Sequence, residues 1–430
     1  MDRVIRIGLL GCGTVGAGVV TILDREADDL AARTGALLQV TRVAVRDTSR
    51  DRGLPLPAEV FTDDPIAVVE ADDVDLIVEV MGGRDLAGTL VRRALELGKP
   101  VVTANKELIA HEGPELAELA RAARVDLSYE AAVAGAIPII KPLKESLAGD
   151  RITRVVGILN GTTNYILTRM SEEKARYADV LAEAQELGFA EADPTSDVGG
   201  HDAASKAAII ASLAFDTTVH AADVFREGIE HVTATDIEVA TRLGYTVKLL
   251  GIASESDGEV AVRVHPTFLP DTHALAGVRG SFNAIYVEAE AAGELMFYGR
   301  GAGGLPTGSA IVGDVIDVAR NLLQGAPGPL ASTHRHKPLR PIEDLQTQYY
   351  VLLDVEDVSG VLAEVARIFG DHGVSIAQVW QEGAGATAQL VLITHRSREG
   401  DLRTCVEALD ASSSVRRVTS VLRVEAEVWE

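Results

Sequence analysis

Residues 188–206 bring together side chains that could move a proton. The segment reads GFAEADPTSDVGGHDAASK and contains Glu191, Asp197, Asp202 and Lys206. We expect a helix to begin near its middle, so Asp202 and Lys206, four residues apart, share one helix face. The apolar run AAIIASLAF continues this helix, which predicts that the pair lies where the helix enters a buried region. An ammonium group in such surroundings can give or take a proton near neutral pH.

An exposed ion pair on a solvated helix is the alternative, and it would stabilise the fold by well under about 1 kcal/mol. Asp202 and Lys206 alone would favour that interpretation. A second lysine, Lys106, follows a predicted strand within TANKE, residues 103–107. Ligands of open α/β sheets bind at the carboxyl ends of the strands, so this lysine is placed where a cofactor and a substrate would meet. Proton exchange beside a hydride carrier is the chemistry that these residues allow.

The segment GCGTVG follows the first predicted strand and opens the first predicted helix. In this context a GxGxxG pattern is typical of a dinucleotide-binding loop. The first glycine allows a tight turn, the second lets the backbone approach a pyrophosphate, and the third permits close packing of helix on strand. Amides at the helix N-terminus bind the phosphates. The predicted cofactor-binding residues of this loop are Gly11, Gly13, Thr14, Val15 and Gly16.

The second predicted strand ends in VAVRD and should lie near the adenine ribose. Arg46 stands where NAD-selective proteins usually have an acidic residue, and a guanidinium group can bind the 2′-phosphate of NADP. Asp47 follows directly. The sequence therefore favours NADP and leaves the use of NAD open, with Arg46 as an ordinary surface cation as the alternative.

The first 129 residues alternate short apolar strands with helical patterns. Strands are expected at VIRIGLL, LLQVTRVAV, VDLIVEV, KPVVTA and VDLSYEA, with helices at residues 15–30, 85–97 and 114–123. This alternation is typical of a parallel sheet covered on both faces. We therefore predict an α/β fold in which residues 1–129 form a Rossmann-like, doubly wound nucleotide-binding domain.

The pattern changes after this domain. Longer helices mixed with strands predict an α+β substrate and dimerisation domain over residues 130–324, whose helix at 306–323 is expected to return to the nucleotide-binding domain. Residues 325–347, rich in Pro, Gly and basic side chains, are interpreted as a linker. Residues 348–430 follow the order strand, helix, strand, strand, helix, strand, which predicts a ferredoxin-like βαββαβ unit.

Charge and cysteine content argue against several classes of function. The 430 residues include 40 Lys and Arg against 64 Asp and Glu, a net charge of −24 that repels nucleic acid and anionic membranes. Cys12 and Cys405 fall in different predicted domains, so neither a disulfide framework nor a thiolate metal cluster is expected. We find no run of about 18 apolar residues and no export leader. A cytoplasmic protein with no nucleic-acid or membrane partner is expected.

Six segments together resemble the homoserine dehydrogenases. GCGTVG, TANKELIA, YEAAVAGAIPII, GILNGTTNYILT, GFAEADPTSDVGGHDAASK and GRGAGGLPTGSA occur in the order found in that family and sample the chain from Gly11 to Ala310. No single segment is decisive, but the ordered set is highly specific. No aspartokinase region precedes the first glycine motif, so the resemblance is to monofunctional members.

The resemblance implies roles for the residues singled out above. The lysine matching Lys206 is the proton donor and acceptor of the family, and the lysine matching Lys106 is a second essential group near nicotinamide and substrate. Residues matching Glu191 and Asp202 bind the substrate, and Asp197 supports them. Further cofactor contacts are assigned to Thr103, Lys106, Gly188 and Gly303.

A monovalent cation, usually sodium, is also implied by the resemblance. Its ligands would be the residues corresponding to Glu130, Val133, Gly135 and Ile137. Oxygen ligands suit a hard cation, and the irregular AAVAG turn can present several carbonyl groups together. From the residues alone, this segment would be only a strand end followed by a proline-bearing helix start.

The C-terminal unit resembles an ACT domain, a module that senses amino acids. The usual Pro-Gly turn after its first strand is replaced by VSG at residues 358–360, which keeps Gly360. An effector site, with L-threonine suggested by the resemblance, and a dimerisation unit without an effector both remain open.

We therefore expect NAD(P)-dependent interconversion of L-homoserine and L-aspartate 4-semialdehyde by a homo-oligomer, either a dimer or a tetramer. The reaction would serve threonine, methionine and isoleucine biosynthesis. An acylating semialdehyde dehydrogenase would need a cysteine nucleophile in the substrate domain, and that domain has none. A non-catalytic amino-acid sensor that keeps a cofactor-binding fold is the alternative from another class.

Overall fold

The structure is a computed structural model that describes residues 3–329, 336–383 and 387–425. It divides into two compact units. The first unit contains Met1–Val155, Ser205–Val224 and Asn283–Lys337, and the second contains Val156–Ala204, Phe225–Phe282 and Pro338–Glu430.

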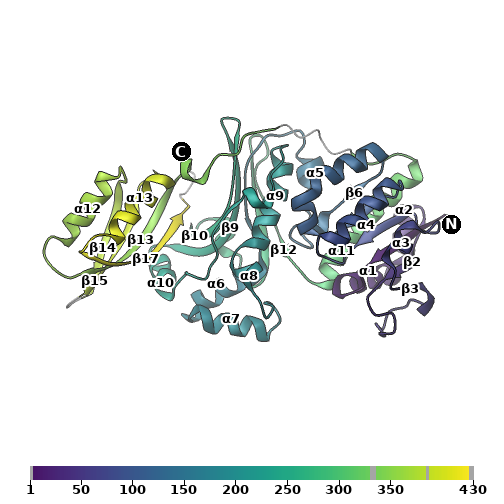
Figure 1. Ribbon diagram of the computed structural model, residues 1–430, viewed down its shortest axis with the longest axis horizontal. Coiled ribbons are helices and arrows are strands. Elements are labelled where there is room, and N and C mark those ends of the chain that lie inside the picture. Colours follow the sequence, from purple (N-terminus) through teal and green to yellow (C-terminus); the bar gives the residue numbers. More distant parts are fainter. Residues whose placement is uncertain (1–2, 330–335, 384–386, 426–430) are drawn as a thin grey trace. The chain divides into compact units, whose positions relative to one another are not determined.

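A six-stranded parallel sheet forms the core of the first unit (Figure 1), with the strand order β3-β2-β1-β4-β5-β6. The order reverses between β1 and β4, which is where folds of this kind bind ligands. The strand bounds are β1 Val4–Leu10, β2 Leu37–Ala44, β3 Phe61–Thr62, β4 Leu76–Glu79, β5 Val101–Thr103 and β6 Leu127–Ser128. This sheet confirms the predicted doubly wound fold.

Helices cover this sheet because their apolar faces join its core. They are α1 Thr14–Arg25, α2 Ala27–Thr34, α3 Pro65–Glu70, α4 Asp85–Glu96, α5 Lys106–Ala123 and α11 Gly304–Gln324. Leu9 of β1, Val19 of α1 and Ile311 of α11 belong to one buried cluster. A helix from late in the chain therefore completes the core of the N-terminal fold.

Two of the predicted helices have different bounds. The helix expected at residues 15–30 is divided into α1 and α2 at Glu26, whose φ of −106° and ψ of 18° leave the helical region. The helix expected to start at Pro114 begins at Lys106 instead, because Asn105 caps it by accepting a hydrogen bond from the Leu108 amide. The proline is tolerated inside the helix, and Lys106 becomes its first residue.

The first unit also includes shorter elements. They are η1 Ala58–Val60, η2 Glu130–Ala132, the π-helical turn η3 Pro142–Ser146, η4 Ala221–Asp223 and the neighbouring strands β11 Phe282–Ala289 and β12 Gly293–Arg300. Three elements run across the division between the units, namely β7 Ile152–Ile158, α9 His201–Ala214 and β11, whose first residue, Phe282, belongs to the second unit.

The second unit is built on strands β9-β10-β17-β13-β15-β14, which are consecutive neighbours in one sheet. Their bounds are β9 Tyr245–Ser256, β10 Glu259–Pro270, β13 Gln346–Glu356, β14 Ile376–Glu382, β15 Thr387–Thr394 and β17 Val415–Val424. Around them lie α6 Gly161–Glu173, α7 Tyr177–Glu186, α8 Thr195–Val198, β8 Phe225–Arg226, α10 Ala234–Arg242, η5 Ala274–Gly277 and η6 Ile342–Asp344.

The C-terminal part of this unit has the predicted ferredoxin-like arrangement. Strand, helix, strand, strand, helix, strand are β13, α12 Val361–Asp371, β14, β15, α13 Glu399–Asp410 and β17, with the short β16 Ser397–Arg398 beside β13. The last strand also pairs with β10 in parallel through Thr267 with Arg423 and Phe268 with Val424. The C-terminal unit therefore continues the sheet of the segment that precedes it.

Candidate active site

The glycine loop between β1 and α1 has the geometry of a phosphate cradle. Gly11 has a φ of +98°, and a Cβ there would lie 2.9 Å from the Val80 carbonyl oxygen. A Cβ on Gly16 would lie 2.4 Å from the Gly11 carbonyl oxygen, whereas one on Gly13 would meet no atom within 4 Å. Gly13 therefore leaves open space, and α1 begins directly after it without a side-chain cap. Free amides beside open space fit a pyrophosphate group.

The first turn of α11 closes against this loop. A Cβ on Gly18 would lie 2.3 Å from the Gly304 carbonyl oxygen, so the two helices approach closely near their N-termini. Gly303, the N-cap of α11, has a φ of +127°, which favours glycine. This places the predicted Gly303 near Thr14, because a Cβ on the following Gly304 would be 2.8 Å from the Thr14 carbonyl oxygen. Gly188, also a predicted cofactor contact, is exposed after α7.

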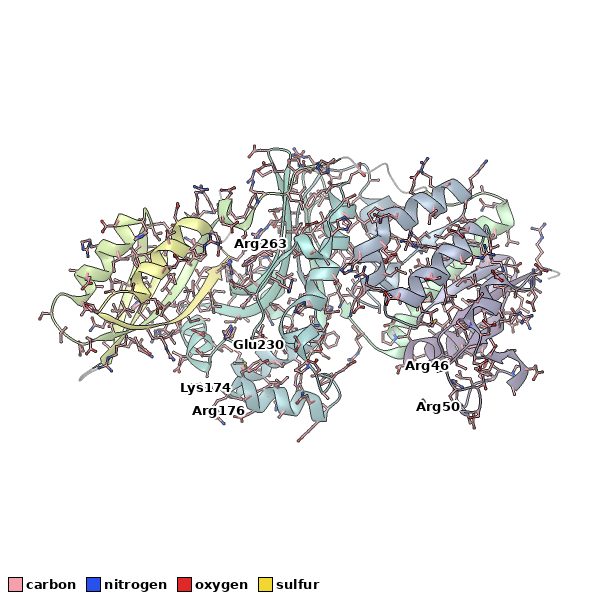
Figure 2. All side chains as sticks on the ribbon, in the orientation of Figure 1. Arg46, Arg50, Lys174, Arg176, Glu230 and Arg263 are labelled. Atoms are coloured by element: carbon pink, nitrogen blue, oxygen red, sulfur yellow. The ribbon has the colours of Figure 1, made fainter. Side chains whose placement is uncertain are left out.

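A pocket of about 690 Å³ extends from the glycine loop to the end of β2 and the loop after it. Arg46, a predicted cofactor-binding residue, lines this pocket, and Figure 2 shows Arg50 on the same loop. Arg52 completes three guanidinium groups, and it lies 5.3 Å from the centroid of the Phe61 ring. We did not predict Arg50 and Arg52, although their short spacing from Arg46 was visible in the sequence. Three cations at one pocket favour an anionic group.

Asp47 also lines this pocket but is held within its own loop. It accepts hydrogen bonds from the Ser49 amide at 2.9 Å and the Ser49 hydroxyl at 2.6 Å, which lower the pKa of this carboxyl group. Its charge therefore partly offsets those of the three arginines.

A buried carboxylate organises the carboxyl ends of β4 and β5. Glu79 is fully buried, and it accepts hydrogen bonds from the Thr103 hydroxyl at 2.6 Å and the Met81 amide at 2.8 Å. Thr103 in turn accepts one from the Asn105 amide at 3.0 Å, which leads into the first turn of α5 and Lys106. Thr103, a predicted cofactor-binding residue, is thus buried and connects Glu79 to Asn105. Lys106 is half-buried at the N-terminus of α5. Glu79 was not predicted, because an acid at the end of an apolar strand has no distinctive spacing.

Two of the predicted acids meet at one amide side chain. Asn160 donates through its Nδ2 atom to Asp197 at 2.6 Å and to Asp202 at 2.9 Å. Its Oδ1 atom accepts a hydrogen bond from the Thr163 amide at 2.8 Å, so the same residue caps α6. The amide therefore separates two carboxylates that would otherwise repel each other. The GILNGTTNYILT segment contained Asn160, but its role depends on contacts across 37 and 42 residues and could not be inferred from spacing.

Asp202 and Lys206 lie on successive turns of α9, as predicted. Asp202 is only 4% exposed and Lys206 only 8%, so the alternative of a solvated ion pair is not supported. Glu191, the other predicted substrate-binding acid, differs from Asp202 in being exposed, in the loop between α7 and α8. In the described residues, its carboxylate makes no hydrogen bond to the Asn160 cluster.

The predicted cation loop follows β6. Its carboxylate, Glu130, accepts hydrogen bonds from the amides of Ile139, Ile140 and Lys141 at 2.6, 2.7 and 2.9 Å. Ala134 and Gly135 both have a φ of +56°, which folds the intervening loop back on itself. A Cβ on Gly135 would lie 2.5 Å from the Gly301 carbonyl oxygen, so only glycine fits there. A tightly turned, buried backbone of this kind fits a site made of carbonyl oxygens, because hard cations bind oxygen.

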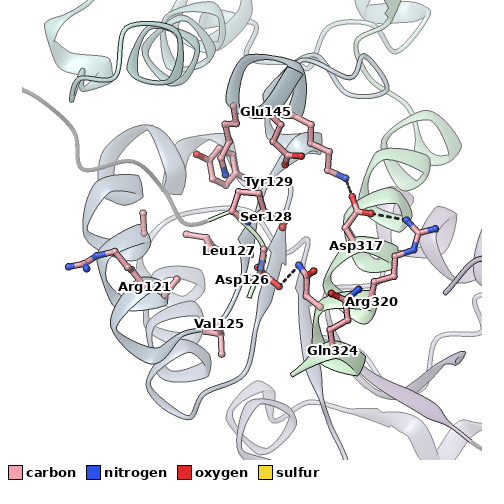
Figure 3. Close-up of a pocket in the computed structure, with 17 residues that line it drawn as sticks. Arg121, Val125, Asp126, Leu127, Ser128, Tyr129, Glu145, Asp317, Arg320 and Gln324 are labelled. Atoms are coloured by element: carbon pink, nitrogen blue, oxygen red, sulfur yellow. Dashed lines mark hydrogen bonds and ion pairs between the residues drawn. The ribbon is translucent and has the colours of Figure 1, made fainter. Parts of the chain in front are cut away.

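A second pocket of about 290 Å³ lies beside this loop and is lined from α5, η3 and α11 (Figure 3). Lys141 is paired there with Asp314 at 3.2 Å and with Asp317. The Lys144 ammonium group lies 5.6 Å from the centroid of the Tyr129 ring, and burial raises the pKa of Tyr129 to about 12. These residues were not predicted to act in catalysis, and the cations and acids of the pocket largely pair with each other.

The described residues contain neither a membrane-spanning helix nor a cluster of metal-binding side chains. No helix there is long and apolar enough to cross a membrane. No group of three or more His, Cys, Asp or Glu side chains in these residues could hold a metal ion.

Comparison with known proteins identifies the family. The homoserine dehydrogenase family matches residues 138–316, its NAD-binding domain matches residues 11–130, and the ACT domain matches residues 349–412. Homoserine dehydrogenases of Corynebacterium glutamicum and Bacillus subtilis are 51% and 43% identical to this chain. The matches cover 97% and 99% of this chain and 95% and 100% of the relatives.

Solved structures agree with this assignment. A homoserine dehydrogenase from Thiobacillus denitrificans superposes with a TM-score of 0.94 at 39% identity, over 98% of both chains. A hyperthermophilic archaeal homoserine dehydrogenase in complex with NADPH gives a TM-score of 0.63 at 28% identity, over 77% of this chain and all of that one. The chain therefore belongs to the homoserine dehydrogenases, oxidoreductases that use a nicotinamide dinucleotide, and has an ACT domain at its C-terminal end.

Proposed function

We propose that this chain interconverts L-aspartate 4-semialdehyde and L-homoserine, with the reduction as the biosynthetic direction. The observation that carries the proposal is α9, which presents buried Asp202 and buried Lys206 on one face while Asn160 fixes the acid. A buried acid and a buried lysine at this spacing suit a substrate with an amino group and a reacting oxygen. This arrangement disfavours the alternative of a sensor without catalysis.

The proposed chemistry assigns one proton step to the chain. The bound dinucleotide supplies a hydride to the carbonyl carbon of the semialdehyde. Lys206 gives a proton to the carbonyl oxygen in reduction and takes it back from the hydroxyl group in oxidation. Lys106, at the carboxyl edge of the sheet, assists at the same oxygen. Asp202 and Glu191 bind the substrate, and Asp197 holds the geometry of Asp202 through the shared amide of Asn160.

Initial rates with L-homoserine and NADP⁺ or NAD⁺ test the activity directly. Reduced cofactor should accumulate with homoserine and stay at background with L-serine, which lacks one methylene group. A chain that binds the dinucleotide but turns over neither substrate would be a sensor, and the proposal would fail.

We further propose that the cofactor is NADPH in preference to NADH. Arg46, Arg50 and Arg52 line the pocket at the end of β2, where the adenine ribose of a dinucleotide lies in this fold. A 2′-phosphate would receive charge-assisted hydrogen bonds there, and NADH offers no group for them. The NADPH complex of the archaeal relative supports this choice.

Replacing Arg46 by alanine should raise KM for NADPH by about tenfold, because one charge-assisted contact is lost. KM for NADH should change little. Arg25→Ala removes an exposed arginine from the end of α1 and is the matched control. If Arg46→Ala weakened both cofactors equally, the residue would be structural and the assignment would be withdrawn.

A monovalent cation, sodium by family resemblance, is proposed at the loop formed by Glu130, Val133, Gly135 and Ile137. The left-handed turn at Ala134 and Gly135 supports this proposal. The cation would stabilise the loop through carbonyl oxygens and would take no part in proton transfer.

We also propose that the ACT domain binds a pathway amino acid, with L-threonine as the leading candidate. A pocket of about 660 Å³ lies where β13 meets α12 and is lined by Asp357, Ser359 and Gly360 among others. Gly360 has a φ of +101°, and a Cβ there would meet no atom within 4 Å. The turn at Gly360 thus leaves open space at the pocket entrance, beside backbone and carboxylate groups that could hold a zwitterion.

Threonine should inhibit the wild-type chain, and Gly360→Asp should abolish the inhibition while the rate without threonine stays unchanged. The new carboxylate would occupy the pocket mouth and repel the effector's carboxylate. Gly325→Asp, at another left-handed glycine with open space around it, is the control.

A shorter chain ending at Ala331, a position outside the described residues, would test whether the ACT domain is separable from the rest of the chain. It would also expose the edge of β10 that β17 covers. If pathway amino acids did not affect the wild-type chain, the ACT domain would serve only in subunit assembly.

A cytoplasmic homo-oligomer in threonine, methionine and isoleucine biosynthesis is proposed on the basis of the family. Exposed apolar side chains on β12, Met296 at 38% and Tyr298 at 55%, support a subunit contact at this strand.

A further inference from the structure

One arginine of the C-terminal unit is buried between two carboxylates. Arg423, on β17, is 5% exposed. It donates to Glu227 from Nη1 at 2.6 Å and to Glu399 from Nη2 at 2.5 Å and Nε at 2.9 Å. Its guanidinium group also lies 5.0 Å from the centroid of the Phe225 ring. Since Glu399 opens α13 and Glu227 follows β8, a single side chain ties the ACT domain to a segment outside it.

The segment that begins at Glu227 lies against the loop between Asp197 and Asp202. The Ile229 amide donates to the Val198 carbonyl oxygen at 2.8 Å. A Cβ on Gly228 would lie 2.3 Å from that same oxygen, and one on Gly200 would lie 3.4 Å from the Glu227 carbonyl oxygen. Two backbone segments thus touch without intervening side chains. Because these contacts join backbone atoms directly, a displacement of Glu227 would also shift residues 198–200.

We propose that Arg423 is a positioning residue for the substrate-binding acid Asp202, and that the ACT domain sets the affinity for homoserine through it. This inference rests on the proposed substrate role of Asp202. Each link is a contact inside one compact unit, from α13 through Arg423 and Glu227 to the loop that leads into α9.

The physical basis is the planar fork of the guanidinium group. It donates toward both carboxylates at once, and a lysine ammonium group cannot reproduce that geometry. Without the cation, Glu227 and Glu399 would face each other as unpaired, partly desolvated charges, and Glu227 would move toward solvent. The Glu399 side is anchored independently, because its carboxylate also accepts a hydrogen bond from the Tyr349 hydroxyl at 2.7 Å. When the cation is removed, Glu227 is therefore the carboxylate that moves first.

The ACT pocket has its own connection to β17. Glu364, one turn into α12, accepts hydrogen bonds from the hydroxyl groups of Ser412 at 2.9 Å and Ser414 at 2.5 Å, just before β17 begins. Movement of α12 on effector binding would be passed to the strand whose other end carries Arg423. This arrangement gives an effector a direct route to homoserine affinity, with no need to alter cofactor binding.

The test is Arg423→Met in the full chain, with Arg416→Met as the matched control. Arg416 lies on the same strand and pairs with Glu356, but its pair is exposed. We expect Arg423→Met to raise KM for homoserine by about fivefold or more, a change typical of coupled sites, while KM for NADP⁺ stays within about twofold. Glu227→Gln should raise KM in the same direction, and its effect should not add to that of Arg423→Met. Arg416→Met should match the wild type.

Hydrogen exchange at the Ile229 amide separates this inference from the proposed site. That amide should exchange faster in Arg423→Met and remain protected in Arg416→Met, whatever the role of Asp202. Asp202→Asn, assayed beside them, tests the substrate site on its own: an unchanged KM there would overturn the proposed role of Asp202. Wild-type exchange at Ile229 in folded Arg423→Met, or an equal rise in both KM values, would overturn the role of Arg423.

Discussion

Replacing Lys206 by alanine should lower kcat by about 100-fold or more, as expected when a general acid and base is lost. The side chain is buried on α9, one turn from Asp202. Binding of the dinucleotide should stay near the wild-type level, since the phosphate loop is formed by a different segment. Steady-state rates with saturating homoserine, together with cofactor titration by fluorescence, measure both quantities.

Lys144→Ala is the matched control, because Lys144 is a partly buried lysine that lies in the pocket beside Tyr129. It should keep kcat within about twofold of the wild type. A Lys206→Ala variant that turns over at the wild-type rate would remove this residue from the mechanism. The proton would then have to come from Lys106, and Lys106→Ala would show the loss instead.

Asn160→Asp should lower kcat/KM for homoserine by about 10-fold to 100-fold, or about 1.4 to 2.7 kcal/mol of transition-state stabilisation. The substitution is nearly isosteric and keeps the cap of α6, because aspartate accepts the Thr163 amide as well as asparagine does. It replaces the amide between Asp197 and Asp202 by a third carboxylate. The three charges repel, and the position of Asp202 is lost.

The pH dependence of this variant gives an independent readout. Protonation of one carboxylate relieves the repulsion, so the activity of the variant relative to wild type should rise between about pH 8 and about pH 6. Asn321→Asp is the control, since Asn321 donates to Asp126 at 3.0 Å and the change creates the same repulsion away from the active site. It should reduce stability but not kcat/KM. Wild-type activity in Asn160→Asp would show that this cluster does not position the substrate.

Local patterns in the sequence were sufficient for several features. The glycine loop could be predicted because its three glycines lie within six residues of each other, and the close approach of Gly16 to the Gly11 carbonyl oxygen stays inside that segment. Alternating strands and helices predicted the parallel sheet, since burial on both faces leaves an apolar run. The helix start at Pro114 was wrong because a proline favours a first turn but does not require one, and the Asn105 cap outweighed it.

The sequence by itself therefore determined the family, the order of the domains and the segments that contain the candidate lysines and acids, because each depends on residues close together along the chain. Only the tertiary structure decided which of them meet. Asn160 reaches Asp197 and Asp202 across 37 and 42 residues, and Arg423 reaches Glu227 across 196. Such contacts depend on how strands and helices pack, and packing leaves no periodic signal between the two positions. The same packing placed Glu191 in an exposed loop although its motif contains the buried acid Asp202.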